Sequence, residues 1–509
     1  MKGETGVTAD GAVPSVACCE ACATAAVPVS MSEPVSAIPI LAPIQVSDRN
    51  LVPVPAPIAR TRGALPVVDG PAPKGVGISR IVDRRIAFGG MAVAAAYLAV
   101  AVASLLLPAA TRLGSWVPLH LALAGAATTA IAALLPFFAA ALVVAPPARP
   151  AIRIGGIALV AIGALAVIVV RGHASGQGLP AALAGGTFLA GLGLVGLAAF
   201  TSVRRANGPR RVLVERAYGL ALANVAIGAT IATLLLGGNP LVGGDWGMLK
   251  PAHAWLNLVG FAGLVVQATL LHLAPTIAGA RIRTRASARV AVIGIAAGAP
   301  AIAFGYITGI DAVARAGALA VLAGGFAAAA HGLVIHRDPG RGSWTTDAEW
   351  RRFTGLSVLL GQVWFGFGLT LAALRVIFIG ATPASWAMVL IVGPLVVGGA
   401  LQILIGAMAH LAPTVGPGDP VRHASQRRLI GRWANARIVL LNAGAAAVAI
   451  GFGFGSTIGS GALGNTLVSL GLGGAGIALG GTLVLLAVAA RPGPASRLVN
   501  YGAGSTPRV

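Results

Sequence analysis

Long apolar runs dominate the chain between residues 86 and 490. Each run extends for roughly 20 to 28 residues, which is enough for a helix to cross about 30 Å of hydrocarbon. Numbered as spans 1 to 12, the runs occupy residues 86–108, 116–144, 152–170, 180–202, 216–237, 251–279, 289–309, 313–336, 352–379, 385–413, 436–456 and 463–490. The pattern predicts an all-α fold, a polytopic membrane helix bundle of about twelve transmembrane helices.

Composition narrows the class further. Hydrophobic residues make up 57% of the 509 residues, charged residues only 10%, and the mean hydropathy is +0.87. Soluble domains carry about 25% charged residues, because the surface that contacts water is rich in charged side chains. The chain therefore cannot be a soluble enzyme or a nucleic-acid-binding domain, and its expected surroundings are a lipid bilayer.

The net charge is +22, and the basic residues alternate between the loops, being few after odd-numbered spans and many after even-numbered spans. Loops after odd-numbered spans hold four basic residues, Arg112, Arg171, Lys250 and Arg315. Loops after even-numbered spans hold twenty: Arg149, Arg153, Arg204, Arg205, Arg210, Arg211, Arg216, Arg281, Arg283, Arg285, Arg289, Arg337, Arg341, Arg351, Arg352, Arg422, Arg427, Arg428, Arg432 and Arg437. Because cytoplasmic loops carry the excess of Lys and Arg, we expect both termini in the cytoplasm of a multi-pass plasma-membrane protein.

Two tails flank the spans. Residues 1–85 are rich in Pro, Ala and Val and hold no run of spanning length, so we expect a disordered cytoplasmic tail. Its Cys18, Cys19 and Cys22 form a Cys-Cys-x-x-Cys motif, which could bind Cu(I) or Zn(II) through thiolates, although no fourth ligand stands nearby. Residues 491–509 form a short second cytoplasmic tail.

Six of the eight histidines lie in the spans or at their ends, and all six fall on even-numbered spans. Ionisable residues inside a bilayer are costly and are candidates for function. His120 and His253 lie near the outer ends of spans 2 and 6. We expect these two imidazoles to clamp a b-type haem, with Arg375 of span 9 on a haem propionate and Asn257, one turn after His253, orienting a neighbouring group. The alternative is a pair of interfacial histidines in an aromatic belt with Trp116 and Trp255.

The other four histidines, His272, His331, His336 and His410, lie near the inner ends of spans 6, 8 and 10. The sequence His-Leu-Ala-Pro-Thr occurs at 272–276 and again at 410–414, which indicates that spans 6 and 10 are related segments of a duplicated bundle. One interpretation is a second haem or a copper site formed by these histidines. The other is a helix-ending motif in which Pro stops the helix and His caps its last carbonyls.

Span 6 carries His253 near its start, continues through Leu-Asn-Leu-Val-Gly-Phe and has Leu-His-Leu-Ala-Pro near its end. Together with His120-Leu-Ala-Leu-Ala-Gly and Leu-Leu-Pro-Phe-Phe of span 2, it resembles the haem-copper oxidase subunit I superfamily. It is also similar to membrane regions of actinobacterial copper oxidases and copper nitrite reductases, and more loosely to the NnrS family. The chain lacks any His-His or His-x-His pair, so a binuclear haem-copper centre is not expected.

These patterns favour a haem-binding redox protein of oxidase-like architecture, in which copper is a further candidate cofactor. It would act as an electron relay or in nitrogen-oxide or copper handling, as an oxidoreductase if it has a substrate. A redox protein or a quinol is the expected partner. Two alternatives remain open, a secondary transporter, which also commonly has internal repeats, and a structural membrane subunit.

Overall fold

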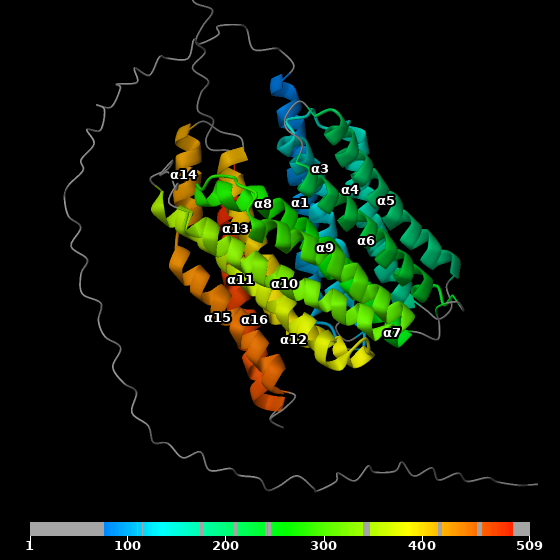
Figure 1. Ribbon diagram of the computed structural model, residues 1–509. Helices are drawn as coiled ribbons and strands as arrows, with labels where there is room; N and C mark the ends of the chain where they lie inside the picture. Colours follow the sequence, from blue (N-terminus) through cyan, green and yellow to red (C-terminus); the bar gives the residue numbers. More distant parts are fainter. Residues whose placement is uncertain are drawn as a thin grey trace, which may run out of the picture. The chain divides into compact units, whose positions relative to one another are not determined.

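The computed structural model describes residues 76–108, 110–113, 116–173, 178–206, 211–239, 242, 246–338, 347–415, 420–455 and 461–491. These residues belong to one compact unit. In this described part the secondary structure is helical and contains no strand. Twelve of its helices are long and apolar enough to cross a membrane, which confirms the predicted all-α polytopic bundle (Figure 1).

Nine of the spans are single α-helices. They are α1 (Val76–Ser104), α4 (Pro150–His173), α5 (Gly178–Arg204), α6 (Val212–Leu236), α9 (Ala286–Thr308), α10 (Asp311–His336), α11 (Ala348–Ile379), α15 (Ala434–Gly455) and α16 (Gly461–Ala490).

Spans 2, 6 and 10 are built differently, because a π-helical segment interrupts each of them. Span 2 consists of α2 (Trp116–His120), η1 (Leu121–Ala127) and α3 (Thr128–Leu142). Span 6 consists of α7 (Trp246–Ala254), η3 (Trp255–Gly263) and α8 (Leu264–Ala278). Span 10 consists of α12 (Met388–Ile391), η5 (Val392–Leu401) and α13 (Gln402–Val415). Every fourth span thus carries a π segment, a feature that is frequent at functional sites.

The same three spans lie deepest in the bundle. Protein buries 56%, 67% and 61% of the most apolar windows of spans 2, 6 and 10, against 28% for spans 1 and 12. The repeat that the sequence indicates between spans 6 and 10 therefore has a structural counterpart that also includes span 2. Of the histidines on these spans, His410 is buried, whereas His120, His253 and His272 are half-buried.

Most predicted ends agree with the structure to within a few residues, and the larger differences occur near prolines. α1 begins at Val76, inside the expected tail, and ends at Ser104, four residues before Pro108. α7 begins at Trp246, so Pro251 lies inside it. A short helix that the hydropathy pattern does not reveal, α14 (Pro420–Gly431), follows span 10 in the basic loop.

Small residues set the closest helix contacts. A Cβ on Gly298 of α9 or Gly317 of α10 would lie 2.5–2.8 Å from the other glycine's carbonyl oxygen. Gly444 of α15 and Gly471 of α16 are related in the same way, at 2.6 Å. Backbones can approach this closely only without side chains, which is how helices associate in lipid, where no hydrophobic force drives them together.

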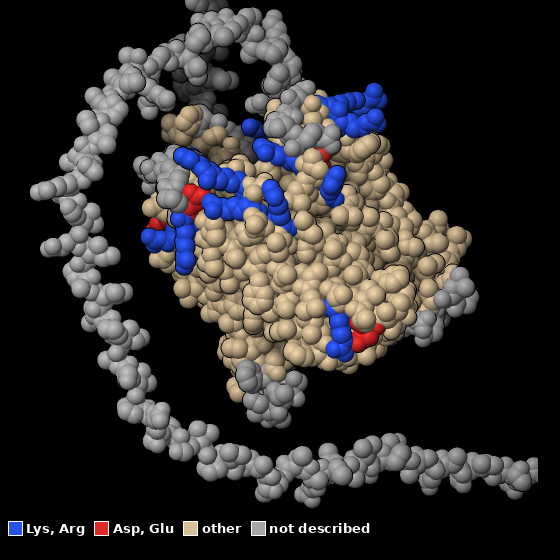
Figure 2. Space-filling model, in the orientation of Figure 1, with Lys and Arg blue, Asp and Glu red and all other residues tan. Residues whose placement is uncertain are grey.

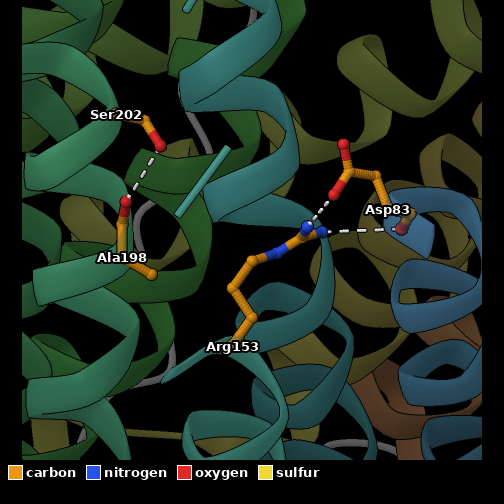
Figure 3. A network of polar contacts seen from close by, with 4 residues as sticks. All are labelled: Asp83, Arg153, Ala198 and Ser202. Carbon is orange, nitrogen blue, oxygen red and sulfur yellow. Dashed lines mark hydrogen bonds and ion pairs between the residues drawn. The ribbon is translucent and has the colours of Figure 1, made fainter. Parts of the chain in front are cut away.

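Basic side chains on the face shown in Figure 2 gather at the end of the bundle where α8 and α14 lie. This is the distribution that the loop charges predict, and the positive-inside rule predicts that this end faces the cytoplasm. Ion pairs accompany it. Arg153 of α4, whose side chain is 2% exposed, reaches Asp83 of α1 at 2.5 Å (Figure 3), and the half-buried Arg427 and Asp347 pair at 2.5 Å.

Candidate functional site

His120 lies at the junction of α2 and η1, where its ring is held by the preceding turn. Its Nδ1 lies 2.8 Å from the carbonyl oxygen of Trp116, and the two rings stack with centroids 3.9 Å apart and planes 21° apart. Because a carbonyl oxygen can only accept, this hydrogen bond assigns the imidazole proton to Nδ1. The lone pair of Nε2 is then available to a ligand.

His253 lies in α7, two residues before η3, and is held by a neighbouring helix. Its Nδ1 donates to the carbonyl oxygen of Gly228 on α6 at 2.9 Å. Asn257 Nδ2 lies 2.8 Å from His253 Nδ1. The Asn257 amide donates to the backbone carbonyl oxygen of His253, at 2.9 Å. The amide of Asn257 therefore lies against the edge of the His253 ring, so the group that Asn257 is placed to orient is His253 itself.

The two histidines are held in the same way. Both residues are half-buried, and each is anchored to a backbone carbonyl through Nδ1. Histidines that bind metals show this arrangement, because the second hydrogen bond fixes the tautomer and the orientation of the ring. The pairing of His120 with His253 that the sequence suggests stays a prediction.

Side-chain hydrogen bonds support the π segments beside these histidines. The hydroxyl of Thr128 donates to Leu123 O in η1 at 3.0 Å, and Asn224 Nδ2 of α6 donates to Gly260 O in η3 at 2.9 Å. Widened π turns need such partners where the regular ladder is interrupted. Span 10 has the third π segment, η5, but Leu390 and Ile391 stand where the other two spans carry histidine.

Interlocking contacts fix span 6 against α6. Gly228 packs against the Asn257 amide, and Gly260 packs against the Asn224 amide, so each helix contributes one glycine and one asparagine. A Cβ on Gly228 would lie 2.6 Å from both amide atoms of Asn257. The absence of a side chain at Gly228 is therefore what lets its carbonyl oxygen reach His253.

Arg375 lies in a different cluster at the outer end. Its guanidinium donates to the carbonyl oxygens of Ala384 at 2.5 Å and Ser385 at 3.2 Å, which belong to the short helix η4 (Pro383–Ser385). The Ser385 hydroxyl also bonds the hydroxyl of Tyr306. These contacts hold the loop between α11 and α12. The expected role of Arg375 on a haem propionate stays a prediction.

Trp386, directly after η4, contacts Trp255 edge to face, with ring centroids 5.6 Å apart. Trp255 and His253 are two residues apart, so they point to different sides of their helix. The cluster around Arg375 is therefore connected to the Trp255 side of span 6.

The inner histidines have separate surroundings. His331 Nδ1 lies 3.1 Å from the hydroxyl of Ser287, whereas His410, 3% exposed, stacks on Trp350 with centroids 5.3 Å apart. His336 lines a small cavity beside Gln362, and the carbonyl oxygen of His272 accepts from Thr276. In the described ranges no three His, Cys, Asp or Glu residues gather in a way that could hold a metal ion. Cys18, Cys19 and Cys22 lie outside the described residues.

The His-Leu-Ala-Pro-Thr repeats do not stop their helices at proline. α8 continues for three residues after Pro275, and α13 continues for two residues after Pro413. Proline has no N–H to donate to the carbonyl oxygen four residues earlier, which for Pro413 is that of Ala409. Trp350 Nε1 donates to this oxygen instead, at 2.8 Å. The expectation that proline ends the helix is therefore wrong in its detail.

An open hollow of about 560 Å³ lies between the inner ends of α8 and α13. Both repeats line it, with Leu273, Pro275 and Thr276 on one side and His410, Leu411 and Thr414 on the other. Sequence reasoning missed this hollow, although the repeated motif marks both of its walls. Sequence reasoning also missed the contact of His253 with Gly228. The signal for it was the spacing of four residues between Asn224 and Gly228 on span 5.

Comparison with known proteins adds no relative, since no family model, curated protein or solved structure matches the chain.

Proposed function

We propose that the chain is a haem-binding redox membrane protein that holds one b-type haem between His120 and His253, near the outer face. The observation that carries the proposal is the shared anchoring of the two imidazoles, because each has Nδ1 within hydrogen-bond distance of a backbone carbonyl, which makes Nε2 the nitrogen with the lone pair. This donor set fits a haem, because neutral imidazoles are common axial ligands. It requires only two histidines, so it does not need a cluster of three or more ligands.

The number of histidines that would hold the haem distinguishes an electron relay from an enzyme with its own substrate. A bound haem would supply one-electron chemistry, and His120 and His253 would hold its iron. A metal that reacts with a substrate keeps a position open, whereas one with all positions filled is suited to passing electrons. We therefore propose an electron relay rather than an enzyme with its own substrate. Trp116, Gly228 and Asn257 are positioning residues, because they hold the two rings.

Optical spectroscopy tests the proposal. The full-length protein, expressed with a haem supply and purified in detergent, should show the sharp alpha and Soret bands of a six-coordinate haem after reduction with dithionite. His120→Ala and His253→Ala should each lose these bands. His272→Ala is the matched control, because it removes an imidazole from the same span about 28 Å away along the helix and should keep the spectrum.

Helix content by circular dichroism and elution as a single species show whether each variant folds. A wild-type protein with a featureless spectrum would overturn the proposal. So would bands that persist unchanged in both His120→Ala and His253→Ala.

A secondary transporter is the second candidate, and one observation favours it. Gln267, Gln362 and Gln402 of spans 6, 9 and 10 are at most 3% exposed, and each has an amide atom without a hydrogen-bond partner. Such buried amides could meet a polar solute. The described carboxylates, by contrast, lie at span ends or in loops, which gives little support for ion coupling. A haem-free wild-type protein that moves a solute in vesicles would favour this candidate.

A further inference from the structure

The hollow between the two His-Leu-Ala-Pro-Thr segments extends from the inner end of the bundle toward its interior. Its lining on span 6 runs from Leu273 to Ala280, and its lining on span 10 runs from His410 to Thr414. From Leu273 to the end of α8 at Ala278, the wall covers about 7–8 Å along the helix axis at 1.5 Å per residue. The hollow therefore lies at the depth where lipid head groups meet their acyl chains.

The wall of this hollow is mainly hydrocarbon. Five of its eight lining residues are apolar residues or glycine: Leu273, Pro275, Gly279, Ala280 and Leu411. Thr276 Oγ1 donates to His272 O at 2.7 Å. In the same way Thr414 Oγ1 donates to His410 O at 2.8 Å. Because both hydroxyls bond their own helix, an apolar chain can lie against them without leaving a donor unpaired. His410 is only 3% exposed and adds little surface.

Exposed arginines follow the hollow at its inner end. Arg281 comes directly after the lining residue Ala280, and Arg283 lies two residues further along; both are exposed. Arg285 is held in an ion pair with Asp338, whereas neither Arg281 nor Arg283 takes part in an ion pair among the described residues. Figure 2 shows that basic side chains gather at this end of the bundle. An apolar wall thus meets a cationic rim.

We propose that this hollow binds an anionic phospholipid of the inner leaflet, with an acyl chain along the wall and the phosphate at Arg281 and Arg283. Basic pockets between transmembrane helices on the cytoplasmic side bind such head groups, and a guanidinium matches the oxygens of a phosphate. A zwitterionic phospholipid fits less well, because its own cation offsets the phosphate. The inference does not use His120 or His253, so it can fail or stand independently of the haem.

Photocrosslinking in the full-length protein tests this site. The protein is placed in phosphatidylcholine nanodiscs that contain phosphatidylglycerol with a diazirine on one acyl chain, and crosslinked peptides are identified by mass spectrometry. We expect saturable crosslinks in residues 273–280 and 410–414, for which unlabelled phosphatidylglycerol competes. A phosphatidylcholine with the same diazirine should label these segments no more than it labels α16.

Three variants separate the rim from the wall. Arg281→Gln should weaken competition by unlabelled phosphatidylglycerol about fivefold, because one basic residue near anionic lipid contributes about 1 kcal/mol. Arg205→Gln is the matched control, because it removes the same charge from an exposed position outside the lining and should behave as the wild type. Ala280→Phe places a ring in the hollow and should remove the crosslinks, although Arg281 remains.

Arg281→Gln alters only an exposed side chain, so it decides the question even if Ala280→Phe does not fold. Four outcomes would overturn the proposal. The first is equal labelling of these segments by the two diazirine lipids. The second is equal competition in the wild type and Arg281→Gln. The third is unchanged crosslinking in a folded Ala280→Phe protein. The fourth is displacement of the crosslinks by decylubiquinone but not by phosphatidylglycerol, which would assign the hollow to a neutral ligand.

Discussion

Gly228→Ala tests the geometry that orients His253. The added Cβ would lie 2.6 Å from Nδ2 and Oδ1 of Asn257, whereas ordinary contacts lie at 3.4–4 Å. Either Asn257 must rotate or α6 must move away from η3. Both changes disturb the ring of His253, because Asn257 lies at its edge and Gly228 O accepts its proton at 2.9 Å.

The expected size of the effect follows from three contributions. Overpacking a filled interface costs about 1–3 kcal/mol. Losing the hydrogen bond at His253 costs about 1 kcal/mol. Replacing glycine by alanine within a helix returns about 0.5–1 kcal/mol. The net expectation for Gly228→Ala is a loss of about 1–3 kcal/mol in the free energy of unfolding, together with weaker retention of haem.

Gly219→Ala is the matched control, because Gly219 lies on the same helix and a Cβ there meets nothing within 4 Å. This variant should be unchanged or more stable by up to about 1 kcal/mol. Unfolding in mixed micelles, followed by circular dichroism, measures both variants against the wild type. Equal stability of Gly228→Ala and Gly219→Ala would refute the close approach of α6 and η3, and with it the anchoring of His253.

Two further predictions concern the charged residues. Asp83→Asn should lower the free energy of unfolding by about 3–5 kcal/mol, because Arg153, 2% exposed, then stays buried without its carboxylate. Asp311→Asn, which opens the exposed pair with Arg315, should change the free energy of unfolding little. A similar loss in both variants would contradict the claim that only the first pair is buried. Arg375→Ala should loosen the loop at Ala384 and Ser385, seen as faster proteolysis there, while the reduced haem spectrum stays; loss of the haem bands with an intact loop would instead support a propionate role for Arg375.

The sequence was sufficient to predict the number and order of the spans. Length, hydropathy and the alternating basic loops all act through the bilayer, which imposes the same requirement on every span. The predicted ends were less accurate near Pro108 and Pro251, because the cost of proline depends on where it falls: α1 ends four residues before Pro108, whereas α7 contains Pro251.

The rotation of each helix could not be predicted. Spans made of Ala, Gly, Leu and Val are apolar on all sides, so no periodic stripe shows which face points inward. The sequence predicts one depth for His120 and His253, but only the structure shows that the carbonyl oxygen of Gly228 on α6 holds the ring of His253. The π segments were also hidden, because their hydrogen bonds depend on partners such as Asn224 in another helix.

The inner hollow illustrates the same limit. The repeated motif pointed to both of its walls, but the stacking of His410 on Trp350 joins spans 9 and 10 and has no signature in either span alone.

Pulsed electron paramagnetic resonance of the oxidised protein, prepared with ¹⁵N-labelled histidine, tests the central claim most directly. We predict hyperfine coupling of the haem iron to nitrogens of two histidines in the wild type. His120→Gly and His253→Gly should each retain one of them, and added unlabelled imidazole should restore the six-coordinate spectrum. Coupling to a single histidine in the wild type, or to two histidines in either variant, would contradict the assignment of His120 and His253 as the pair that holds the haem.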